Sequence, residues 1–492
     1  MNKRSNRPNI LLLLGDHEIF HGHDGPGTIG FRWPRFDAFA AQGVRFDHAY
    51  CVSPLCSPAR SSLWTGMYPF AHGISWNTKM LGCPEDFRQG QLLYSHHLSR
   101  AGYRNAYIGK WHCGDERTPI DYGIEGWAPP GYGAVYALPQ YHAWLEASGI
   151  KDPQLSIECL PGRPELRGTT QPLAPHTLRF FRASGVLRAP RAAHESDFVA
   201  AETIGKMREL AKGSQPWSLI SSFWAPHFPY FPTEPFAGMV DPGIIPEYPT
   251  FRDESRDRPI RNTLVAGHHP HHATELRGWP DWQPMLARAY EQGYQTDAAM
   301  GQILDALDEL GLAENTLVLW TADHGDAIAS HGGLFDKGTM SEEVLRIRFA
   351  ARWPAAFRGG VSCDSPITNM DVTATMLEAA GAAIPPEMHS RSLLPSCRAE
   401  ASLPDHVVIQ HDGLWFHTTV RAAATRRYKY VADLFDRHEL YDLENDPWEK
   451  NNLIDSPAHI DVAEDLRAKI LAHIETTGDP LAEGLGMRLR GR

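Results

Sequence analysis

The chain has 492 residues, of which 42% are hydrophobic and 22% are charged, and its formal net charge is −12. This length exceeds one typical hydrophobic core, so we expect two domains or a large domain with an appendage, and the composition is that of an ordinary globular protein. The negative charge disfavours nucleic acid and anionic membranes as partners, and no stretch reaches the length of a membrane span.

The first apolar run, residues 10–14, is too short for the core of a secretory signal peptide, and no small-residue cleavage site follows it. The seven cysteines are odd in number and show no paired spacing. Cys51 and Cys56 lie near each other but lack a matching Cys/His pair that would complete a zinc site. These features predict a cytoplasmic protein without structural disulfides.

Four short apolar runs, each followed by ionisable residues, organise the first two thirds of the chain. Continuous apolar runs predict strands buried on both faces, hence a largely parallel sheet. Helical patterns at 34–42 and 285–310 lie between them, and such alternation is typical of an α/β fold, which binds ligands at the carboxyl ends of its strands. We therefore expect the polar residues after the four runs to converge on one pocket. The runs are 9–14, 105–108, 217–224 and 316–321, and the residues that follow are Asp16 and His17, Lys110 and His112, His227, and Asp323 and His324.

The segment that begins at Cys56 predicts a helix with a nucleophile at its start. Ser57 suits the N-cap, Pro58 the first turn and Gly66 the exit. Cys56 would then face unpaired backbone N–H groups and the positive end of the helix dipole, with Arg60 one turn further in. This arrangement favours an anion site, and a buried structural cysteine on a capped helix is the alternative for this short motif alone.

Asp16, Asp323 and His324 offer two carboxylates and an imidazole, which with one more oxygen can hold a divalent cation. For the Asp323-His324 pair by itself, a turn with a structural histidine is the alternative. Two such polar pairs at strand ends, with the Cys56 segment between them, favour the metal site.

Four further residues are cationic or can donate a proton, and together they suit an oxyanion such as sulfate. Each one alone is more often a surface or capping residue, because a long side chain can pack along apolar surface with its charge in water. The four are Lys110, His112, His227 and Lys337.

Segments 113–200 and 230–284 are rich in Pro, Gly and aromatic residues and predict excursions over the pocket. The second contains His268, His269, His271 and His272, which we interpret as part of a solvated loop, with substrate or metal contact as the alternative.

Several prolines between residues 380 and 404 mark a change in the composition of the sequence. Beyond them, the stretches 407–410, 416–421 and 427–431 predict a smaller antiparallel sheet, and an amphipathic helix over 460–474 should cover it. We therefore predict a catalytic α/β domain over residues 1–385 and a C-terminal α+β subdomain over residues 386–492.

Five blocks of this sequence resemble, in the same order, the blocks of the type I sulfatases, a family of the alkaline phosphatase superfamily. The resemblance implies an α/β sandwich with a large mixed, mostly parallel sheet and a smaller C-terminal antiparallel sheet. It also implies an arylsulfatase-like sulfuric ester hydrolase, acting on a small aryl or alkyl sulfate ester. The blocks are Cys56-Ser57-Pro58-Ala59-Arg60 with Leu63-Trp64-Thr65-Gly66, Gly109 to Gly114, Ala225 to Tyr230, Asp323 to Asp326 with Lys337, and Glu439 to Leu453.

The resemblance further implies that a formylglycine-generating maturation enzyme oxidises Cys56 to formylglycine. A bare thiol could attack sulfur but would stay trapped, because it has no second hydroxyl with which to expel sulfate. The implied roles are Arg60 to hold the aldehyde diol, Lys110 and Lys337 to neutralise the sulfuryl oxygens, His227 with Lys337 nearby to protonate the leaving oxygen, and His112 to deprotonate the second hydroxyl.

The implied metal ligands are Asp16, Cys56 in its modified form, Asp323 and His324. The family usually has two aspartates after the first strand, where this chain has Asp16 followed by His17, so whether His17 is a ligand stays open. Many members have Asp-Asn where this chain has Asp323-His324. The resemblance favours calcium. Manganese is the alternative, because imidazole is a softer ligand than oxygen.

Choline sulfatases and phosphonate monoester hydrolases also resemble this variant of the metal block. A phosphonate monoester or phosphodiester hydrolase that uses the same formylglycine is therefore the alternative activity. A non-catalytic binding protein with this fold is disfavoured by the intact set of site residues. We expect a small-molecule substrate and no nucleic acid or membrane as partner, and a homo-oligomer remains open.

Overall fold

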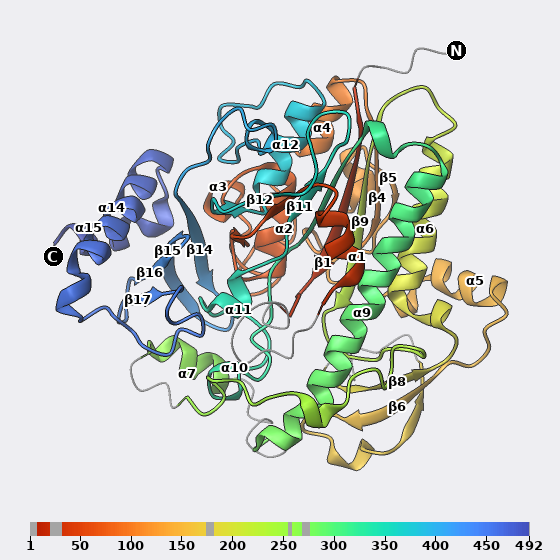
Figure 1. Ribbon diagram of the computed structural model, residues 1–492, viewed down its shortest axis with the longest axis horizontal. Helices are drawn as coiled ribbons and strands as arrows, with labels where there is room; N and C mark the ends of the chain where they lie inside the picture. Colours follow the sequence, from red (N-terminus) through yellow and green to blue (C-terminus); the bar gives the residue numbers. More distant parts are fainter. Residues whose placement is uncertain (1–6, 20–31, 174–181, 254–257, 268–275, 492) are drawn as a thin grey trace.

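A computed structural model describes residues 7–19, 32–173, 182–253, 258–267 and 276–491. Its centre is an eight-stranded sheet in the order β12-β2-β11-β10-β1-β9-β4-β5, in which only β11 runs antiparallel to its neighbours (Figure 1). The predicted mixed, mostly parallel sheet is thus confirmed. The strands are β1 (Asn9–Asp16), β2 (Val44–Phe46), β4 (Arg104–Gly109), β5 (Glu125–Trp127), β9 (Trp217–Pro226), β10 (Thr316–Ala322), β11 (Ala350–Arg352) and β12 (Val361–Cys363).

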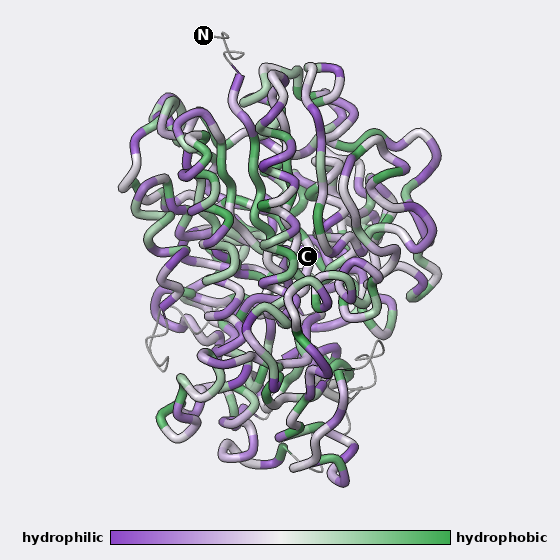
Figure 2. Tube along the Cα trace, turned by 90° about the vertical axis from the view of Figure 1, so that its right-hand side faces the viewer, coloured by the Kyte–Doolittle hydropathy of each residue, from purple (hydrophilic) through white to green (hydrophobic). Residues whose placement is uncertain are grey.

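Strand β1 shows why this sheet is buried on both faces. Leu11 and Leu13 belong to one hydrophobic cluster and Leu12 and Leu14 to another, because successive side chains of a strand point to opposite faces. The apolar interior and polar exterior are visible in Figure 2. Helices α1 (Pro34–Ala40), α6 (Glu195–Leu210) and α9 (Trp279–Glu309) cover one face, and α2 (Cys56–Thr65), α4 (Tyr94–Arg100) and α12 (Asp371–Ala379) cover the other.

A four-stranded antiparallel sheet follows near the C-terminus, as predicted. It consists of β14 (His406–Gly413), β15 (His417–Thr425), β16 (Tyr428–Asp433) and β17 (Glu439–Asp442), covered on one face by α14 (Ile460–Thr477) and α15 (Glu483–Arg490). On α14, Leu466, Ile470 and Ile474 are buried, whereas Ile460 is 54% exposed, so the predicted apolar stripe begins later than expected. The boundary at residues 385/386 remains a prediction.

The segment 113–200 contains a small antiparallel sheet that the sequence pattern did not predict. Its central strand β6 (Gln154–Cys159) lies between β7 (Thr170–Pro172) and β8 (Ser184–Arg188), and α5 (Pro139–Ala147) precedes it. These strands lack the long apolar runs of the central sheet, so the sequence pattern predicts only an irregular excursion in this segment. The histidines at 268, 269, 271 and 272 lie outside the described residues.

Helix α9 begins at Trp279, six residues earlier than the predicted start at 285, and it includes Pro284 in its interior. Within the described ranges, no helix combines the length and the apolar character needed to cross a membrane. The remaining short elements are β3 (Ala49–Tyr50) paired with β13 (Ile367–Thr368), α3 (Pro69–His72), α7 (Ile260–Gly267), α10 (Ser330–Gly333), α11 (Glu342–Leu345) and α13 (Leu394–Cys397).

Candidate active site

Hydrogen bonds join the carboxyl ends of β1 and β10, which places their polar residues side by side. The Asp323 amide donates to the Gly15 carbonyl oxygen at 3.2 Å, and the Glu18 amide donates to the His324 carbonyl oxygen at 3.0 Å. The His17 amide donates to Asp323 Oδ1 at 3.1 Å. At the ends of β4 and β9, the Lys110 amide donates to the Ser222 carbonyl oxygen at 2.9 Å.

Cys56 is the first residue of α2 and is fully buried against these strand ends. Its Sγ lies 3.1 Å from His324 Nε2 and 3.8 Å from Asp16 Oδ1. Helix α2 ends at Thr65 and is followed by Gly66 as its C-cap, as predicted. The φ of 68° places Gly66 in the left-handed region. The predicted convergence of the cysteine with the metal residues is therefore present in the structure.

The prediction of Ser57 as N-cap was wrong, because Leu55 occupies that position and contributes no side-chain cap. Ser57 lies one residue inside the helix, and its hydroxyl accepts a hydrogen bond from the Thr78 amide at 3.4 Å. Asn77 Oδ1 accepts from the Ser57 amide at 3.1 Å, so a neighbouring loop satisfies this first-turn N–H.

Arg60 ties three of the strand ends to α2. Its Nε donates to Asp323 Oδ2 at 2.8 Å, and its Nη1 donates to the Lys110 carbonyl oxygen at 3.0 Å and to Ser222 Oγ at 2.8 Å. Its Nη2 lies 3.7 Å from Asp16 Oδ1 and has no hydrogen-bond acceptor among the described residues. This N–H group is therefore available to a ligand beside Cys56.

The four predicted metal ligands fit a divalent ion. One donor atom from each of Asp16, Cys56, Asp323 and His324 lies within 4.8 Å of the others, and all four side chains are buried. Burial and the neighbouring Asp323 raise the pKa of Asp16 to about 8. Burial also disfavours the charge on Asp323, but His324, Arg60 and Lys110 outweigh it and hold the pKa of Asp323 well below its usual value. A cation would relieve the crowding of these two carboxylates.

The ring of His17 packs edge-on against the ring of His324 at 4.9 Å, but its two nitrogens meet other groups. Its Nε2 lies 3.3 Å from Asp326 Oδ1 and 3.6 Å from Asp336 Oδ1, and its Nδ1 lies 3.3 Å from Lys337 Nζ. Burial, Lys337 and His324 lower the pKa of His17 well below its ordinary value, so the ring is neutral. The geometry therefore gives His17 a supporting position beside the candidate ligands.

Lys337 and His227 form a hydrogen-bonded pair next to His17. Lys337 Nζ lies 3.3 Å from His227 Nε2, and His227 Nδ1 lies 2.7 Å from the Phe228 carbonyl oxygen. Burial and Lys337 lower the pKa of His227 well below its ordinary value. Although burial opposes its charge, Asp336 raises the pKa of Lys337. In the free protein the ammonium of Lys337 is thus the proton carrier, and the neutral imidazole accepts at Nε2.

Lys110 and His112 both pack against Tyr132, whose hydroxyl lies 3.3 Å from His227 Nδ1. Lys110 Nζ forms an ion pair with Asp16 and lies 4.2 Å from the centre of the Tyr132 ring, which the His112 ring meets edge-on at 5.3 Å. His112 Nδ1 is buried without a hydrogen-bond partner in the described part of the chain. Burial and Lys110 lower the pKa of His112 well below its ordinary value, so it is a neutral base.

Backbone strain is concentrated around this site. His17, His112 and Asp336 have φ angles of 61°, 54° and 77°, although none of them is glycine. Non-glycine residues rarely adopt this left-handed region, and they hold it only where the surrounding contacts impose it.

The structure adds residues that the sequence did not single out. Ser222 on β9 accepts from Arg60 and donates to the Lys110 carbonyl oxygen, both at 2.8 Å. Asp336 contacts Lys337 at 3.4 Å, and Tyr132 packs against Lys110. Strand β9 carries three buried serines, Ser218, Ser221 and Ser222, and Ser222 is the one next to the apolar end of the strand, so the available signal did not single it out. Tyr132 lies in an irregular segment without any such pattern.

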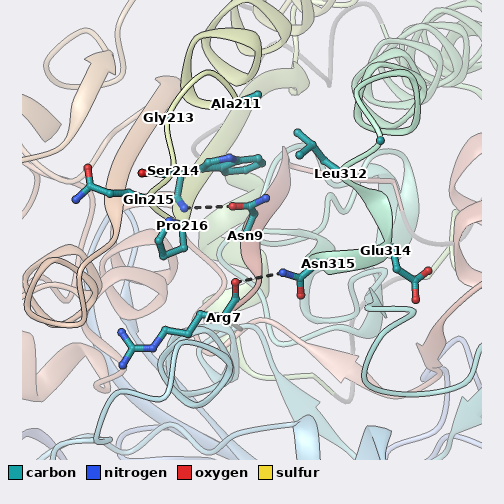
Figure 3. Close-up of a pocket in the computed structure, with 12 residues that line it drawn as sticks. Arg7, Asn9, Ala211, Gly213, Ser214, Gln215, Pro216, Leu312, Glu314 and Asn315 are labelled. Carbon is teal, nitrogen blue, oxygen red and sulfur yellow. Dashed lines mark hydrogen bonds between the residues drawn. The ribbon is translucent and has the colours of Figure 1, made fainter. Parts of the chain in front are cut away.

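A pocket of about 100 Å³ lies at the opposite, amino-terminal edge of the central sheet (Figure 3). There Asn9 Oδ1 accepts from the Trp217 amide at 3.4 Å, and Asn315 Nδ2 donates to the Arg7 carbonyl oxygen at 3.3 Å. The side-chain amides of Asn9 and Asn315 thus join the starts of neighbouring strands, which is a structural role. The chemistry-bearing residues lie at the other edge.

Comparison with known proteins agrees with this geometry. The sulfatase family model matches residues 8–382, and a model of the C-terminal region of N-sulphoglucosamine sulphohydrolase matches residues 330–476. An uncharacterized sulfatase of Escherichia coli is 26% identical over 96% of this chain and 88% of its own length. The choline-sulfatase of Rhizobium meliloti is 26% identical over 92% of this chain and 83% of its own length. A phosphonate monoester hydrolase from Silicibacter pomeroyi superimposes with a TM-score of 0.78 at 20% identity, covering 97% of both chains.

Proposed function

The chain belongs to the sulfatase family, and from this premise we propose that it hydrolyses small alkyl or aryl sulfate esters with a formylglycine made from Cys56. The observation that carries the proposal is the position of Cys56. It is the first residue of a buried helix, with Sγ 3.1 Å from His324 Nε2 and beside Asp16. An inert core cysteine would not need two candidate metal ligands and Arg60 around it.

Conversion of the Cys56 thiol to an aldehyde needs an external oxidant and a separate maturation enzyme. The hydrated aldehyde supplies two hydroxyls, one to attack sulfur and one whose deprotonation expels sulfate. A divalent ion held by Asp16, Asp323, His324 and the modified residue 56 would acidify the attacking hydroxyl and neutralise the sulfuryl oxygens. We favour calcium, with manganese as the alternative because His324 adds a nitrogen to the donor set.

The cationic side chains hold the sulfuryl group and the diol. Lys110 Nζ and Lys337 Nζ are fixed by hydrogen bonds and ion pairs before any substrate arrives, so their charges need little reorganisation. Arg60 keeps Asp323 ionised through Nε and offers Nη2 to the diol. Neutral His112 is suited to take the proton of the second hydroxyl.

The departing alkoxide takes its proton from the Lys337–His227 pair. In the free protein the proton resides on Lys337 Nζ, and His227 Nε2 accepts a hydrogen bond from it at 3.3 Å. As negative charge develops on the leaving oxygen, this pair can release a proton towards it, either from the ammonium or through the imidazole.

The cheapest test is the mass of the peptide that contains Cys56, isolated from protein co-expressed with a maturation enzyme. We expect the mass of an aldehyde, and Cys56→Ala should abolish turnover of nitrophenyl sulfate while leaving thermal unfolding unchanged. Cys51→Ala is the matched control and should retain activity, because Cys51 belongs to the hydrophobic core and its Sγ lies 3.6 Å from the Val344 carbonyl oxygen. Activity of Cys56→Ala at the wild-type level would refute the mechanism.

The alternative is a phosphonate monoester or phosphodiester hydrolase with the same nucleophile. His324 favours it, because an imidazole ligand at this position is the feature in which the chain resembles that class. Rates on nitrophenyl sulfate and on phenyl phosphonate esters, measured on one preparation with known aldehyde content, decide between the two.

We also propose a cytoplasmic location, since no disulfide joins any of the seven cysteines, all of which lie in the described residues, and reduced thiols suit a reducing compartment.

A further inference from the structure

The block around residues 439–453 has no part in the chemistry above, yet it meets the segment that carries Lys337. The contact is made by Glu449 of this block together with Lys429, which lies on the preceding strand β16 and is fully buried. Lys429 Nζ lies 3.0 Å from Glu342 Oε1 and 2.6 Å from Glu449 Oε1, and it donates to the Met340 carbonyl oxygen at 2.7 Å. A lysine of the C-terminal sheet thus binds three groups near the active-site edge.

Glu449 makes a second attachment to the same segment. Its Oε2 accepts a hydrogen bond from the Glu342 amide at 2.7 Å, so one carboxylate binds both the lysine and the backbone. The Glu342 carboxylate in turn accepts from Arg346 Nη1 and from the Tyr50 hydroxyl, each at 3.3 Å. Lys429, Glu342, Glu449 and Tyr50 are buried, and the Arg346 side chain is 14% exposed, so water does not compete strongly for these contacts.

The attached segment leads directly to the active site. Glu342 lies five residues after Lys337 in the chain. His331 Nε2 lies 3.1 Å from Glu343 Oε1, which closes the loop on the other side of Lys337. The Gly325 amide donates to the Val344 carbonyl oxygen at 2.7 Å, so the end of the segment also abuts the residue that follows His324.

A metal ion is the competing explanation for this cluster, because donor atoms of His331, Glu343 and Glu449 lie within 4.8 Å of one another. Lys429 already places an ammonium 2.6 Å from Glu449. With Arg346 beside Glu342, the cluster holds its own cations and has less need of an added one. The ion-pair network is therefore the better explanation.

We propose that Lys429 and Glu449 are positioning residues of the reaction. From the C-terminal sheet they hold residues 340–342, and through these they keep Lys337 Nζ between His17 and His227. This inference rests on the proposed function, in which Lys337 and His227 protonate the leaving group.

The test compares Lys429→Met with Lys337→Ala on an alkyl sulfate and on nitrophenyl sulfate, after metal and aldehyde contents have been matched. A proton donor matters for a basic alkoxide and hardly for a good leaving group, so Lys337→Ala should lose about 100-fold more on the alkyl ester. Lys429→Met should show the same bias, because a displacement of about 1 Å can cost about 100-fold. Lys429→Arg, which keeps the cation, should recover much of the loss.

Arg421→Met is the matched control. Arg421 is a fully buried cation on the neighbouring strand β15, and its ion-pair partners are Asp412 and Asp479. The Arg421→Met variant should have a lower melting temperature, but its rates on the two substrates should fall by the same factor. If Lys429→Met does not fold, Glu449→Gln takes its place in the same comparison.

Suppose that Lys337→Ala loses more rate on the alkyl ester, but Lys429→Met or Glu449→Gln loses the same rate on both esters. This result would overturn the positioning role alone. An unbiased Lys337→Ala would instead overturn the role of Lys337 in the proposed function, and the inference with it.

Discussion

Asp16 and His17 are neighbours in the chain, but their side chains belong to different parts of the site. Asp16 points at Cys56 and Lys110, whereas the His17 ring lies against Asp326, Asp336 and Lys337. His17 lies one residue beyond the end of β1 and has a left-handed backbone with a φ of 61°, so the alternation of the strand does not fix the direction of its side chain.

Asp16→Asn and Asp323→Asn should each lose metal and activity together, since each removes a negative ligand. His17→Ala should weaken metal binding by about tenfold or less, the lower end of what supporting residues cost. Metal content after dialysis, measured beside activity, checks this. A His17→Ala protein as empty of metal as Asp16→Asn would show that histidine has replaced the second aspartate of the family.

His227→Ala should lose far more rate on an alkyl sulfate than on nitrophenyl sulfate, because only the basic alkoxide needs a proton. The expected bias is about 100-fold, within the range of general acid catalysis. Both rates must be measured on one preparation with its metal and aldehyde checked. Equal loss on the two esters would mean that His227 only braces the loop at Phe228.

The histidine pKa directions predict the pH profile of kcat/KM. His112 and His227 have pKa values well below 6.5, so both stay neutral as the pH falls through that value. Lys337 has a pKa above its ordinary 10.5, so its ammonium persists as the pH rises. We expect a rate that is flat from about pH 7 to about pH 10, measured with metal bound. An acid limb near 6.5 that disappears in His112→Ala would contradict this.

At the level of elements, the end of β4 depends on one glycine. Gly109 has a φ of 109°, and a Cβ there would lie 1.9 Å from the Ser222 carbonyl oxygen of β9. That oxygen also accepts from the Lys110 amide, so a larger residue would push Lys110 away from Asp16.

Gly109→Ala should therefore cost about 3 kcal/mol of unfolding free energy through strain and overpacking, and it should lower activity. Gly102→Ala is the matched control, because Gly102 also has a positive φ but open space around it, and it should cost about 1 kcal/mol. Urea unfolding measures both. If the two variants lose the same unfolding free energy, the close approach of β4 to β9 at Gly109 does not add to the cost of the substitution.

At the level of the whole molecule, the C-terminal sheet is packed into the main core. Val407, Ile409 and Val420 belong to the same hydrophobic cluster as Leu12 and Leu63, and the Gln410 amide donates to the Val52 carbonyl oxygen at 2.9 Å. Arg261 forms buried ion pairs with Asp433 and Glu439, which link α7 to the same sheet.

We therefore expect the full chain to unfold in a single calorimetric transition, with equal calorimetric and van't Hoff enthalpies. A chain that ends at residue 385 should not fold, because it would expose the apolar surface that β14 and β15 cover. Two separate transitions, or a folded truncated chain, would instead indicate two domains with independent cores.

The sequence by itself predicted four of the eight central strands, β1, β4, β9 and β10, the helix at Cys56 and ten candidate site residues. The strands β2, β5, β11 and β12 were not predicted. Buried parallel strands require continuous apolar runs, and ligands of such sheets gather where the strands end, so both features are local and readable. The small sheet at 154–188 was missed because its short strands carry no comparable run.

Only the tertiary structure decided how those residues face one another. The nitrogens of His17 meet Asp326, Asp336 and Lys337, which lie more than 300 positions away in the chain. Lys337 Nζ lies 3.3 Å from His227 Nε2, although 110 positions separate the two residues. The link from Lys429 to Glu342 joins residues 87 positions apart. No local pattern encodes such contacts, because burial and long-range packing set both the geometry and the charge of each group.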